Sequence, residues 1–470
     1  MDSSNNRTEK ENTMGDMKEL TRRDFLTRSA KTAGKLAAAG TVMSGVKPRS
    51  VLGANDRIVM AVIGIRGRGR QHYREWANIP NVEVKTLCDV DDNLFEERVK
   101  ELEELQKKKP ITEIDLRRVY DDKDIDAVSI ATTDHWHALA TIWACQAGKH
   151  VYVEKPTSHN IWEGRKTIEA ARKYNRIVAA GTQNRSIRNV RKAMEFLHQG
   201  GIGKLYMAKG LCFKPRDSIG RKQDCPIPQG VHYDLWLGPA PWRPFNPNRF
   251  HYNWHWFWDY GCTDMGNQGP HQMDVARWGM QKNIHPRKIK CVGGYYAFDS
   301  DQETPNTQQA IFEYDDGTFI QFETRGVYTN SEDDILIGNL FFGSEGWMHL
   351  NGNEWKTYFG RDNTPGPSSA DIPQEGKDEA ADPMNLLGTG SENHFANFIY
   401  ALRTGNWMNL NSDIQEGHMS TAMCHLGNIS NRLGRELTFD SHAERFVGDD
   451  IANSYLTRDY RYPYVVPEKV

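Results

Sequence analysis

The sequence predicts an α/β protein: an N-terminal doubly wound parallel sheet, then a C-terminal α+β domain with an open, mostly antiparallel sheet. Three observations support this fold class. The chain has 470 residues, more than the roughly 250–300 at which a single core stops growing, so we expect two domains. Short apolar runs alternate with helical patterns from residue 58 to 183, as in a doubly wound sheet. After about residue 187 the pattern changes to alternating strands, which favours an antiparallel sheet.

The composition excludes several classes of protein. Lys and Arg total 59 against 62 Asp and Glu, a net charge of −3, so a nucleic-acid binder that relies on a basic surface is not expected. With 38% hydrophobic and 10% aromatic residues, the chain does not have the composition of a disordered protein. No apolar run reaches the roughly 18 residues of a membrane span. The seven cysteines are scattered without a C-x-x-C pair, which predicts buried free thiols.

Residues 1–54 are predicted to be an export signal and linker. An Arg-Arg pair at 22–23 precedes a weakly apolar run at 36–46, which is typical of a twin-arginine (Tat) signal. Small residues at 44–54 suit a cleavage site. We therefore expect export to the periplasm by the Tat machinery. The alternative is a charged N-terminal tail in which the two arginines are adjacent by chance.

A glycine-rich turn follows the first expected strand. Residues 58–63 read IVMAVI and lead through GIRGRGRQH into a helical pattern. Strand, glycine-rich turn and helix in this order predict a dinucleotide site, because the turn approaches the pyrophosphate and the helix N-terminus binds it. The match to G-x-G-x-x-G is imperfect, since an arginine occupies the middle position. The residues expected to contact the cofactor here are Gly64, Arg66, Gly67, Arg68 and Gly69.

The second strand, expected over 82–88, is followed by Asp89, 20 residues beyond Gly69. An acidic residue at this spacing accepts a hydrogen bond from the ribose 2′-hydroxyl. Because its carboxylate would repel a 2′-phosphate, NAD is favoured over NADP. The alternative is an ordinary loop carboxylate.

The rest of the first domain continues the alternation of strands and helices. A charged helix is expected over about 92–108. Further strands are expected at 126–133, 150–156 and 177–183, and helices at 135–148 and 161–174. The first domain is thus expected over residues 55–182, with five strands in a parallel sheet of the Rossmann type.

The stretch 126–156 reads DAVSIATTDHWHALATIWACQAGKHVYVEKP and closely resembles the signature of the Gfo/Idh/MocA oxidoreductases, typified by glucose–fructose oxidoreductase and inositol dehydrogenase. The resemblance covers about residues 55–435. It implies that Lys155 contacts both the nicotinamide ribose and the reacting hydroxyl. A lysine at the carboxyl end of a parallel strand also lies where ligands bind in such sheets. The resemblance assigns three further residues to the cofactor, Thr132, His137 and Glu154. Gln183 is also expected to bind the cofactor.

The second domain is expected over residues 183–440 and resembles the substrate domain of the family, which often forms the oligomer interface. A dimer or tetramer is therefore expected. A long loop is expected over 361–385, which is rich in Pro, Gly, Asp and Ser. Residues 441–470 are expected to be a tail on the surface or on a neighbouring subunit. Strands are expected at 204–213, 288–298, 308–314, 318–328 and 335–342, with a hairpin at Asp316-Gly317, and helices at 187–199, 391–404 and 414–434.

The segment 251–278 carries the expected proton carrier. The family has a D-x-G-x-H-x-x-D motif, and this chain matches its histidine and last aspartate with His271 and Asp274. Histidine suits proton transfer because its pKa lies near neutrality. Asn267 replaces the first aspartate, which leaves the chemistry to His271 and Lys155. Asp264, three residues earlier, is a candidate to take over part of that role; the alternative for His271 is a buried structural histidine.

Six of the 13 tryptophans lie between residues 236 and 278, which favours a carbohydrate cleft because aromatic faces suit sugar rings. The alternative is that most of them pack in the core. His251 and His255 are four residues apart, but no third ligand follows at a suitable spacing, so no metal site is expected. The residues assigned to the substrate are Arg185, Trp254, Asp264, Asn267 and His271.

These expectations combine into an exported, NAD-dependent oxidoreductase that acts on a sugar or glycoside hydroxyl. Oxidation at C3 follows from the resemblance, and a tightly bound, recycled cofactor follows from the expected export. The alternative is an NAD-dependent glycosidase of the N-acetylgalactosaminidase kind, which needs a further base near C2; Tyr252, His251 and His255 are candidates. A non-catalytic binding protein is the third hypothesis.

Overall fold

The structure is a computed structural model that describes residues 57–372 and 392–470. The predicted export signal therefore lies outside the described residues. Among the residues that are described, no helix is long and apolar enough to cross a membrane.

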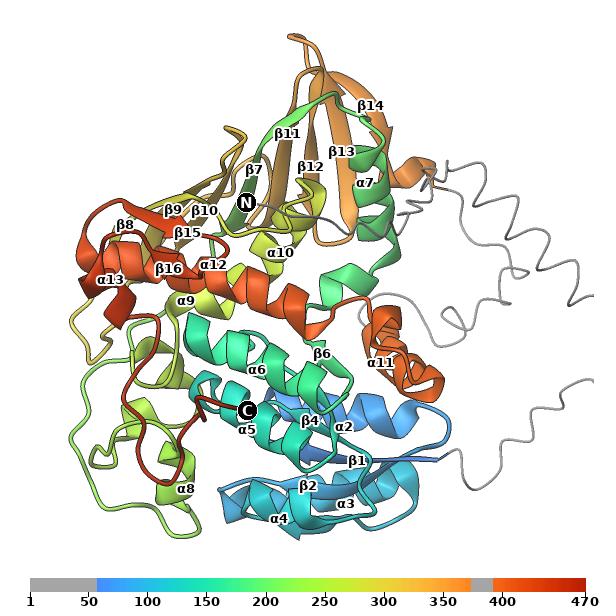
Figure 1. The fold of residues 1–470 in the computed structure, drawn as a ribbon, viewed down its shortest axis with the longest axis vertical. Helices are drawn as coiled ribbons and strands as arrows, with labels where there is room; N and C mark the ends of the chain where they lie inside the picture. The colour runs from blue at the N-terminus through green and yellow to red at the C-terminus, as the bar shows by residue number, and fades with distance from the viewer. Residues whose placement is uncertain (1–56, 373–391) are drawn as a thin grey trace, which may run out of the picture. The chain divides into compact units, whose positions relative to one another are not determined.

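The N-terminal part of the chain is a six-stranded parallel sheet in the order β3-β2-β1-β4-β5-β6. Helices from the crossover connections cover the sheet (Figure 1). The predicted doubly wound fold is confirmed. Its strands are β1 (Ile58–Ile63), β2 (Val82–Cys88), β3 (Ile111–Glu113), β4 (Ala127–Ile130), β5 (His150–Val153) and β6 (Val178–Ala180). Its helices are α2 (Arg68–Asn78), α3 (Phe95–Gln106), α4 (Leu116–Asp121), α5 (Asp134–Gln146) and α6 (Ile161–Lys173).

The expected number of strands in this sheet was wrong by one. β3 has only three residues, and none of them is buried, so it lacks the apolar run that marks the other strands.

The second part of the chain is built on a ten-stranded sheet in the order β14-β13-β12-β11-β7-β10-β9-β8-β15-β16. β7 and β10 run parallel, and the other paired neighbours are antiparallel, which confirms the predicted mostly antiparallel sheet. Its strands are β7 (Leu205–Cys212), β8 (Lys288–Gly294), β9 (Thr307–Glu313), β10 (Phe319–Arg325), β11 (Ile337–Gly343), β12 (Gly346–Asn351), β13 (Glu354–Phe359), β14 (Thr364–Ser368), β15 (Leu437–Asp440) and β16 (Arg445–Phe446). The helices of this part are α7 (Arg188–His198), α8 (Tyr233–Leu237), α9 (Thr263–Asn267), α10 (Gly269–Gly279), α11 (Glu392–Thr404), α12 (Ile414–Leu433) and α13 (Asp450–Ser454).

Sequence reasoning missed the strands β12 to β14. Part of the loop expected over 361–385 is strand β14, although its sequence, TPGPS, contains two prolines. The sheet order explains this, because β14 is an edge strand and an edge tolerates residues without an N–H. Residues 373–391 of the expected loop lie outside the described residues.

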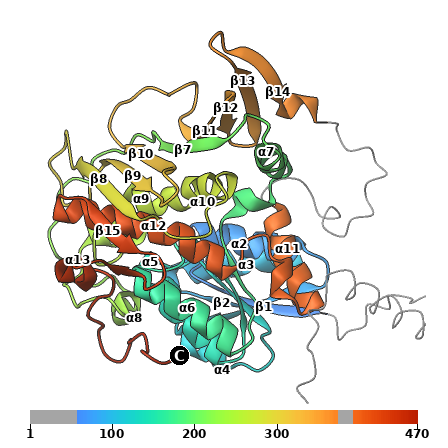
Figure 2. The ribbon, with the colours of Figure 1, turned by 45° about the horizontal axis from the view of Figure 1, so that its top comes forward.

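Helix α12 joins the two sheets into one body. Most of its side chains are buried, and it packs against α6 on one side and against α10 and β8 on the other (Figures 1 and 2). Asp413 caps its N-terminus by accepting a hydrogen bond from the Gln415 N–H, and Gly434 ends it in the left-handed conformation. Because α12 is buried on several faces, it holds the two domains together on either side of the cleft.

The C-terminal residues pack against the Rossmann domain of the same chain. Tyr464, Val466 and Val470 are buried in a cluster with residues of α5 and α6. The Tyr464 ring lies edge-on to Trp136 of α5, with centroids 5.5 Å apart. The tail expected on the surface therefore also contributes to a core.

Residues 213–262, which we call the aromatic segment, cross from the end of β7 to the Rossmann domain. The segment has its own core, in which Tyr233 and Trp236 stack with centroids 5.5 Å apart. It is fixed to the loop after β2 by two backbone hydrogen bonds of 2.8 Å, from His232 N–H to Val90 C=O and from Asp92 N–H to Gly230 C=O. It therefore closes one side of the cleft at the ends of the parallel strands.

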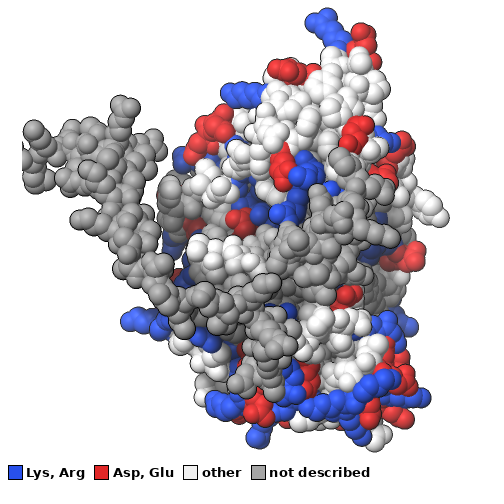
Figure 3. Space-filling model, turned by 90° about the vertical axis from the view of Figure 1, so that its right-hand side faces the viewer, with Lys and Arg blue, Asp and Glu red and all other residues white. Residues whose placement is uncertain are grey.

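Charged side chains of both signs are interspersed on the lower part of the face in Figure 3. The structure also contains ion pairs between charged side chains, for example Arg70 of α2 with Glu101 of α3 at 2.9 Å. This mixed surface agrees with the near balance of charges in the sequence.

Candidate active site

A cavity of about 820 Å³ lies at the carboxyl ends of the parallel strands, and residues of the aromatic segment and α10 line its other side. It includes the switch point at β1, whose neighbours in the sheet are β2 and β4. Ligands bind at this place in open α/β sheets. The cavity brings together most of the predicted site residues: Gly64, Arg66, Gly67, Arg68, Asp89, Thr132, His137, Glu154, Lys155, Gln183, Trp254, Asn267 and His271. Gly69, Arg185 and Asp264 are not part of its lining.

The glycine-rich turn has the geometry that a pyrophosphate needs. Gly64 has φ +82°, and a Cβ there would lie 2.6 Å from the Ala131 carbonyl oxygen. A Cβ on Gly69 would lie 1.6 Å from the Gly64 carbonyl oxygen, so Gly69 supports the turn from behind rather than lining the cavity. Gly67 has nothing within 4 Å of the Cβ position. The N-terminal turn of α2 contains no acidic residue, so this turn can hold an anionic dinucleotide.

Asp89 lies in the cavity wall after β2, as the sequence predicts. Its Oδ2 accepts a hydrogen bond of 2.8 Å from the Ile65 N–H, and its Oδ1 one of 3.1 Å from the Asp91 N–H. Burial raises the pKa of Asp89 to about 6, although these backbone hydrogen bonds oppose the rise. A second acidic residue, Asp91, also lines the cavity and was not among the predicted residues.

Glu154 is the centre of a buried hydrogen-bond network under the turn. Its Oε1 accepts from Arg68 Nε at 2.8 Å, His72 Nε2 at 3.0 Å and Gln183 Nε2 at 3.0 Å. Burial alone would raise the pKa of Glu154, but the charge of Arg68 and the hydrogen bond from His72 hold it well below its usual range. The carboxylate thus fixes Arg68 beside the glycine-rich turn and Gln183 at the end of β6.

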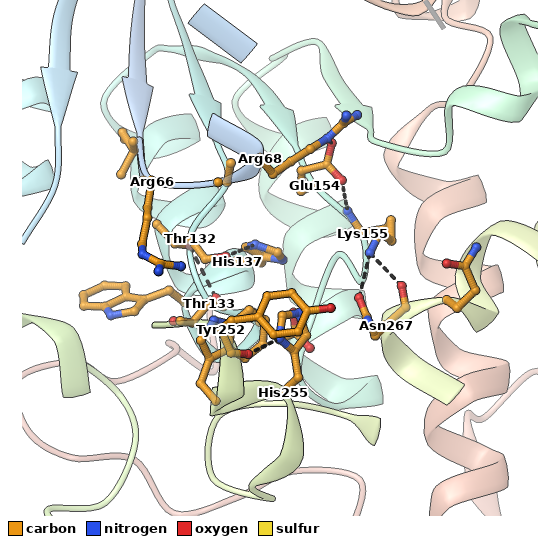
Figure 4. Close-up of a pocket in the computed structure, with 18 of the residues that line it drawn as sticks. Arg66, Arg68, Thr132, Thr133, His137, Glu154, Lys155, Tyr252, His255 and Asn267 are labelled. Carbon is orange, nitrogen blue, oxygen red and sulfur yellow. Dashed lines mark hydrogen bonds and ion pairs between the residues drawn. The ribbon is translucent and has the colours of Figure 1, made fainter. Parts of the chain in front are cut away.

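Lys155, two residues after the end of β5, projects into the cavity (Figure 4). Its Nζ donates to the Asn267 carbonyl oxygen at 2.6 Å and to Asn267 Oδ1 at 3.3 Å. An ammonium group has three N–H donors, so one remains for a substrate oxygen. Burial lowers the pKa of Lys155, while the nearby carboxylates oppose this effect.

His271 lines the same cavity on α10. Its Nδ1 is buried without a hydrogen-bond partner. Burial lowers the pKa of His271 to about 3, and the charge of Lys155 adds to this. The imidazole is therefore neutral at neutral pH, which is the protonation state of a proton acceptor, but the lowered pKa makes it a weaker base than a free histidine.

Arg185 and Asp274 pair with each other rather than facing the cavity. Arg185 Nε lies 2.7 Å from Asp274 Oδ2, and its Nη2 lies 2.8 Å from Glu416 Oε2 of α12. Asp274 is fully buried. The predicted substrate contact at Arg185 therefore has a second explanation, which is an ion pair that holds α10 against α12.

Asp264 also lies behind the cavity wall. It is 3% exposed, and its carboxylate accepts from Arg216 at 2.6 and 3.0 Å and from Asn267 Nδ2 at 3.3 Å. Arg216 in turn donates to the Tyr252 hydroxyl at 3.0 Å. Asp264 is therefore linked to two residues that line the cavity: to Asn267 by a direct hydrogen bond, and to Tyr252 by way of Arg216.

The aromatic segment supplies the opposite wall. Trp254 and His255 stack with ring centroids 3.6 Å apart, and both line the cavity with Tyr252. Figure 4 shows Tyr252 and His255 approaching His137 and Thr132 from this segment. Burial lowers the pKa of His255 to about 3. Trp236 and Trp256 belong to the segment's own core, and Trp236 also lines the cavity.

His251 and His255 are not part of a metal-type cluster. Within the residues that the structure describes, one group has suitable ligand atoms close together: His285, His418 and Glu444. It lies outside the cavity lining, and Arg165 pairs with the same carboxylate, with Nε 2.9 Å from Glu444 Oε2. The carboxylate charge is already compensated there by a guanidinium.

Besides Asp91, the sequence reasoning missed Asp134 and Arg216. Asp134, at the start of α5, is 2% exposed and lines the cavity. Its Oδ2 has no hydrogen-bond partner, and burial raises its pKa well above the usual range. A signal was present, because Asp134 directly follows the β4 turn in the stretch 126–156. Arg216 carried no local signal, since its partner is 48 residues away in the chain.

Comparison with known proteins agrees with this geometry. Residues 58–182 match the NAD-binding Rossmann domain of the Gfo/Idh/MocA oxidoreductase family. Residues 204–338 and 370–466 match the C-terminal alpha/beta domain of the same family. The chain belongs to the Gfo/Idh/MocA oxidoreductases. The family membership predicted from the stretch 126–156 is thus confirmed.

The curated relatives of this Gfo/Idh/MocA protein match over about a third of its chain. A glycosyl hydrolase family 109 protein of Shewanella pealeana is 30% identical over 148 residues, which are 30% of this chain and 31% of the relative. The uncharacterized oxidoreductase YrbE of Bacillus subtilis is 28% identical over 153 residues, 33% of this chain and 43% of the relative. The matched region therefore covers less than half the length of each of these relatives.

Solved structures match over most of the chain at low sequence identity. Levoglucosan dehydrogenase in complex with NADH has a TM-score of 0.60 at 18% identity, covering 81% of this chain and 98% of its own. Aldose-aldose oxidoreductase from Caulobacter crescentus has a TM-score of 0.59 at 16% identity, covering 82% and 100%. These structures show that the two-domain fold is shared.

Proposed function

We propose that this protein oxidises a hydroxyl group of a sugar or glycoside, with C3 as the site and NAD as the cofactor. The observation that carries the proposal is the convergence of Lys155 and His271 on one cavity at the ends of the parallel strands. A donor that can hold an alkoxide and a neutral base that can accept its proton are the two groups this reaction needs.

The residues at the first strand ends fit a nicotinamide dinucleotide. The turn at Gly64–Gly67 leaves room for a pyrophosphate, and the carboxylates of Asp89 and Asp91 at the other end suit ribose hydroxyls rather than a 2′-phosphate. When bound, the nicotinamide supplies a hydride acceptor. This arrangement supports NAD over NADP.

The protein's own residues would handle the proton. Lys155 directs its third N–H to the substrate oxygen, because Asn267 holds the other two. His271 accepts the hydroxyl proton in its neutral form. Trp254 offers an aromatic face to the sugar ring from the opposite wall.

We also propose that the cofactor stays bound and is recycled in place. The predicted Tat signal would deliver the folded protein to the periplasm, where free NADH has no ordinary route of reoxidation. The two backbone hydrogen bonds that join the aromatic segment to the loop after β2 would slow the release of the cofactor. We further propose that the protein assembles into a dimer or tetramer.

A second candidate is a redox-neutral glycosidase. In this reaction, oxidation at C3 acidifies the C2 proton, the C1 substituent is eliminated, water adds, and C3 is reduced again. The family 109 glycosyl hydrolases among the relatives favour it. So do Tyr252 and His255, which line the cavity and would supply the extra base at C2.

Incubation of the purified protein with 4-nitrophenyl glycosides, without an added electron acceptor, tests both candidates. One 3-keto product per bound cofactor, with NADH absorbance at 340 nm, supports the dehydrogenase. Many equivalents of nitrophenol without net NADH support the glycosidase. Absence of nicotinamide from the purified protein, together with no binding of added NADH, would overturn both.

A further inference from the structure

The side-chain amide of Asn267 lies between a group that only donates hydrogen bonds and one that only accepts them. Lys155 Nζ is 3.3 Å from Asn267 Oδ1, and Asp264 Oδ1 is 3.3 Å from Asn267 Nδ2. An ammonium has no acceptor and an ionised carboxylate has no donor. The two neighbours therefore allow one orientation of the amide, with oxygen toward the lysine.

Asp264 itself is held in place by Arg216. The guanidinium donates to both carboxylate oxygens, at 2.6 and 3.0 Å, which is the bidentate geometry of a strong ion pair. The Arg216 side chain is 14% exposed and that of Asp264 is 3% exposed. Arg216 Cζ also lies 5.2 Å from the centre of the Trp256 ring. The carboxylate therefore has little freedom to turn away from Asn267.

We propose that Asp264, clamped by Arg216, is a positioning residue for Lys155: it orients the Asn267 amide so that two N–H groups of the lysine are held and the third points into the cavity. This inference rests on the proposed function. It assigns to Asp264 a role behind the cavity wall in place of the substrate contact expected from the sequence.

The same geometry explains why asparagine stands where the family motif has aspartate. An aspartate at 267 would place a carboxylate oxygen about where Nδ2 now lies, 3.3 Å from Asp264 Oδ1. Two carboxylates at that distance repel each other unless one is protonated. Asn267 and Asp264 therefore complement each other. The neutral amide of Asn267 contacts the lysine, and the negative charge of Asp264 lies on the far side of that amide.

Other charged and titratable groups face Lys155 from the elements packed around it. The acidic groups are Glu154 after β5, Asp134 of α5, Asp264 of α9 and the Cys424 thiol of α12. The basic groups are Arg68 of α2, His137 of α5, His255 of the aromatic segment and His271 of α10. Asp264 is the one among the carboxylates that also bonds to the residue holding the lysine.

Two variants at position 264 separate orientation from charge. Asp264→Ala removes the acceptor, so the Asn267 amide can turn; we expect kcat to fall about tenfold or more with KM changed less than about threefold. Asp264→Asn keeps a carbonyl oxygen that can accept from Asn267, so it should recover most of the rate. Both variants remove a negative charge, and both should lower the pKa of Lys155.

The pKa of Lys155 can be measured without substrate, by competitive acetylation over a range of pH and mass spectrometry of the Lys155 peptide. Asn267→Asp should raise this pKa by about one unit or more, because a carboxylate then faces the ammonium directly. The double variant Asp264→Asn with Asn267→Asp exchanges the two groups. It should restore the rate relative to Asn267→Asp alone, since the amide at 264 can donate to the carboxylate at 267.

Asp259→Asn is the matched control. Asp259 is also in the aromatic segment and pairs with an arginine, Arg243 Nη1 at 2.9 Å, but it does not line the cavity. It should change neither the rate nor the labelling of Lys155. Unchanged kcat in Asp264→Ala, or an unchanged Lys155 pKa in Asp264→Ala and Asn267→Asp, would overturn the inference. Because labelling needs no turnover, it still gives an answer if no glycoside proves to be a substrate.

Discussion

The two walls of the cavity are built in different ways. On the cofactor wall, Gly64 and Asp89 follow directly after β1 and β2, and Lys155 lies two residues after the end of β5, so the backbone of the sheet sets their positions. On the aromatic wall, residues 213–262 contain short helical turns. Packing of their side chains and two backbone hydrogen bonds to the loop after β2 hold this segment in place. The first wall suits a cofactor common to the family, and the second wall can change with the substrate. The predictions below test this division.

The largest effect is expected at the cofactor wall with Lys155→Ala. This change removes the N–H group directed to the substrate oxygen, so kcat should fall at least about 10³-fold. Binding of NADH, followed by its fluorescence, should persist because the glycine-rich turn is intact. A variant with more than a tenth of the wild-type rate would show that Lys155 is not in the reaction centre.

The two glycines of the turn should respond differently. Gly69→Ala places a Cβ 1.6 Å from the Gly64 carbonyl oxygen, and we expect it to lower the free energy of unfolding by at least about 2 kcal/mol. Gly67→Ala meets no atom within 4 Å, so stability should change by less than about 0.5 kcal/mol while NADH binding weakens. Urea unfolding and NADH titration of both variants check this. Equal stability of the two variants would contradict the packing argument.

The sequence predicted the cofactor wall better than the aromatic wall, and the reason is physical. Strand, turn and helix leave a local pattern, so β1, β2 and the residues after them could be located within a residue or two. The clamp of Arg216 on Asp264 depends on a contact between residues 48 positions apart, and Arg185 was assigned to the substrate although it pairs with Asp274. Such long-range pairs leave no spacing that a single sequence reveals.

At the aromatic wall we expect a smaller effect, confined to the substrate. Trp254→Ala removes the ring that stacks on His255 at 3.6 Å, so KM for the glycoside should rise about tenfold. Affinity for NADH should stay within about twofold, since the ring belongs to the other wall. Trp242→Ala is the control on the same segment, because Trp242 is 68% exposed and is outside the cavity lining. A loss of NADH affinity in Trp254→Ala would show that the two walls do not act separately.

The smallest expected effect is a pH dependence of cofactor binding that comes from Asp89. Burial raises the pKa of this carboxyl to about 6, and the ionised form accepts hydrogen bonds from ribose hydroxyls. Protonation below pH 6 therefore opposes binding, and the Kd for NADH should rise by up to about tenfold from pH 7 to pH 5.

The raised pKa of Asp89 makes folding stability depend on pH in the opposite direction to NADH binding. A carboxyl with a raised pKa binds more protons in the native state than in the unfolded one between about pH 4 and pH 6. Asp89 therefore lowers the free energy of unfolding as pH rises through this window, and Asp89→Asn should remove both this slope and the pH dependence of NADH binding. Asp124→Asn is the control, because Asp124 has a side chain that is 80% exposed and lies outside the cavity lining. If Asp89→Asn binds NADH with the wild-type pH profile, the carboxylate at the end of β2 is a structural partner of the Ile65 N–H and not a ligand of the ribose.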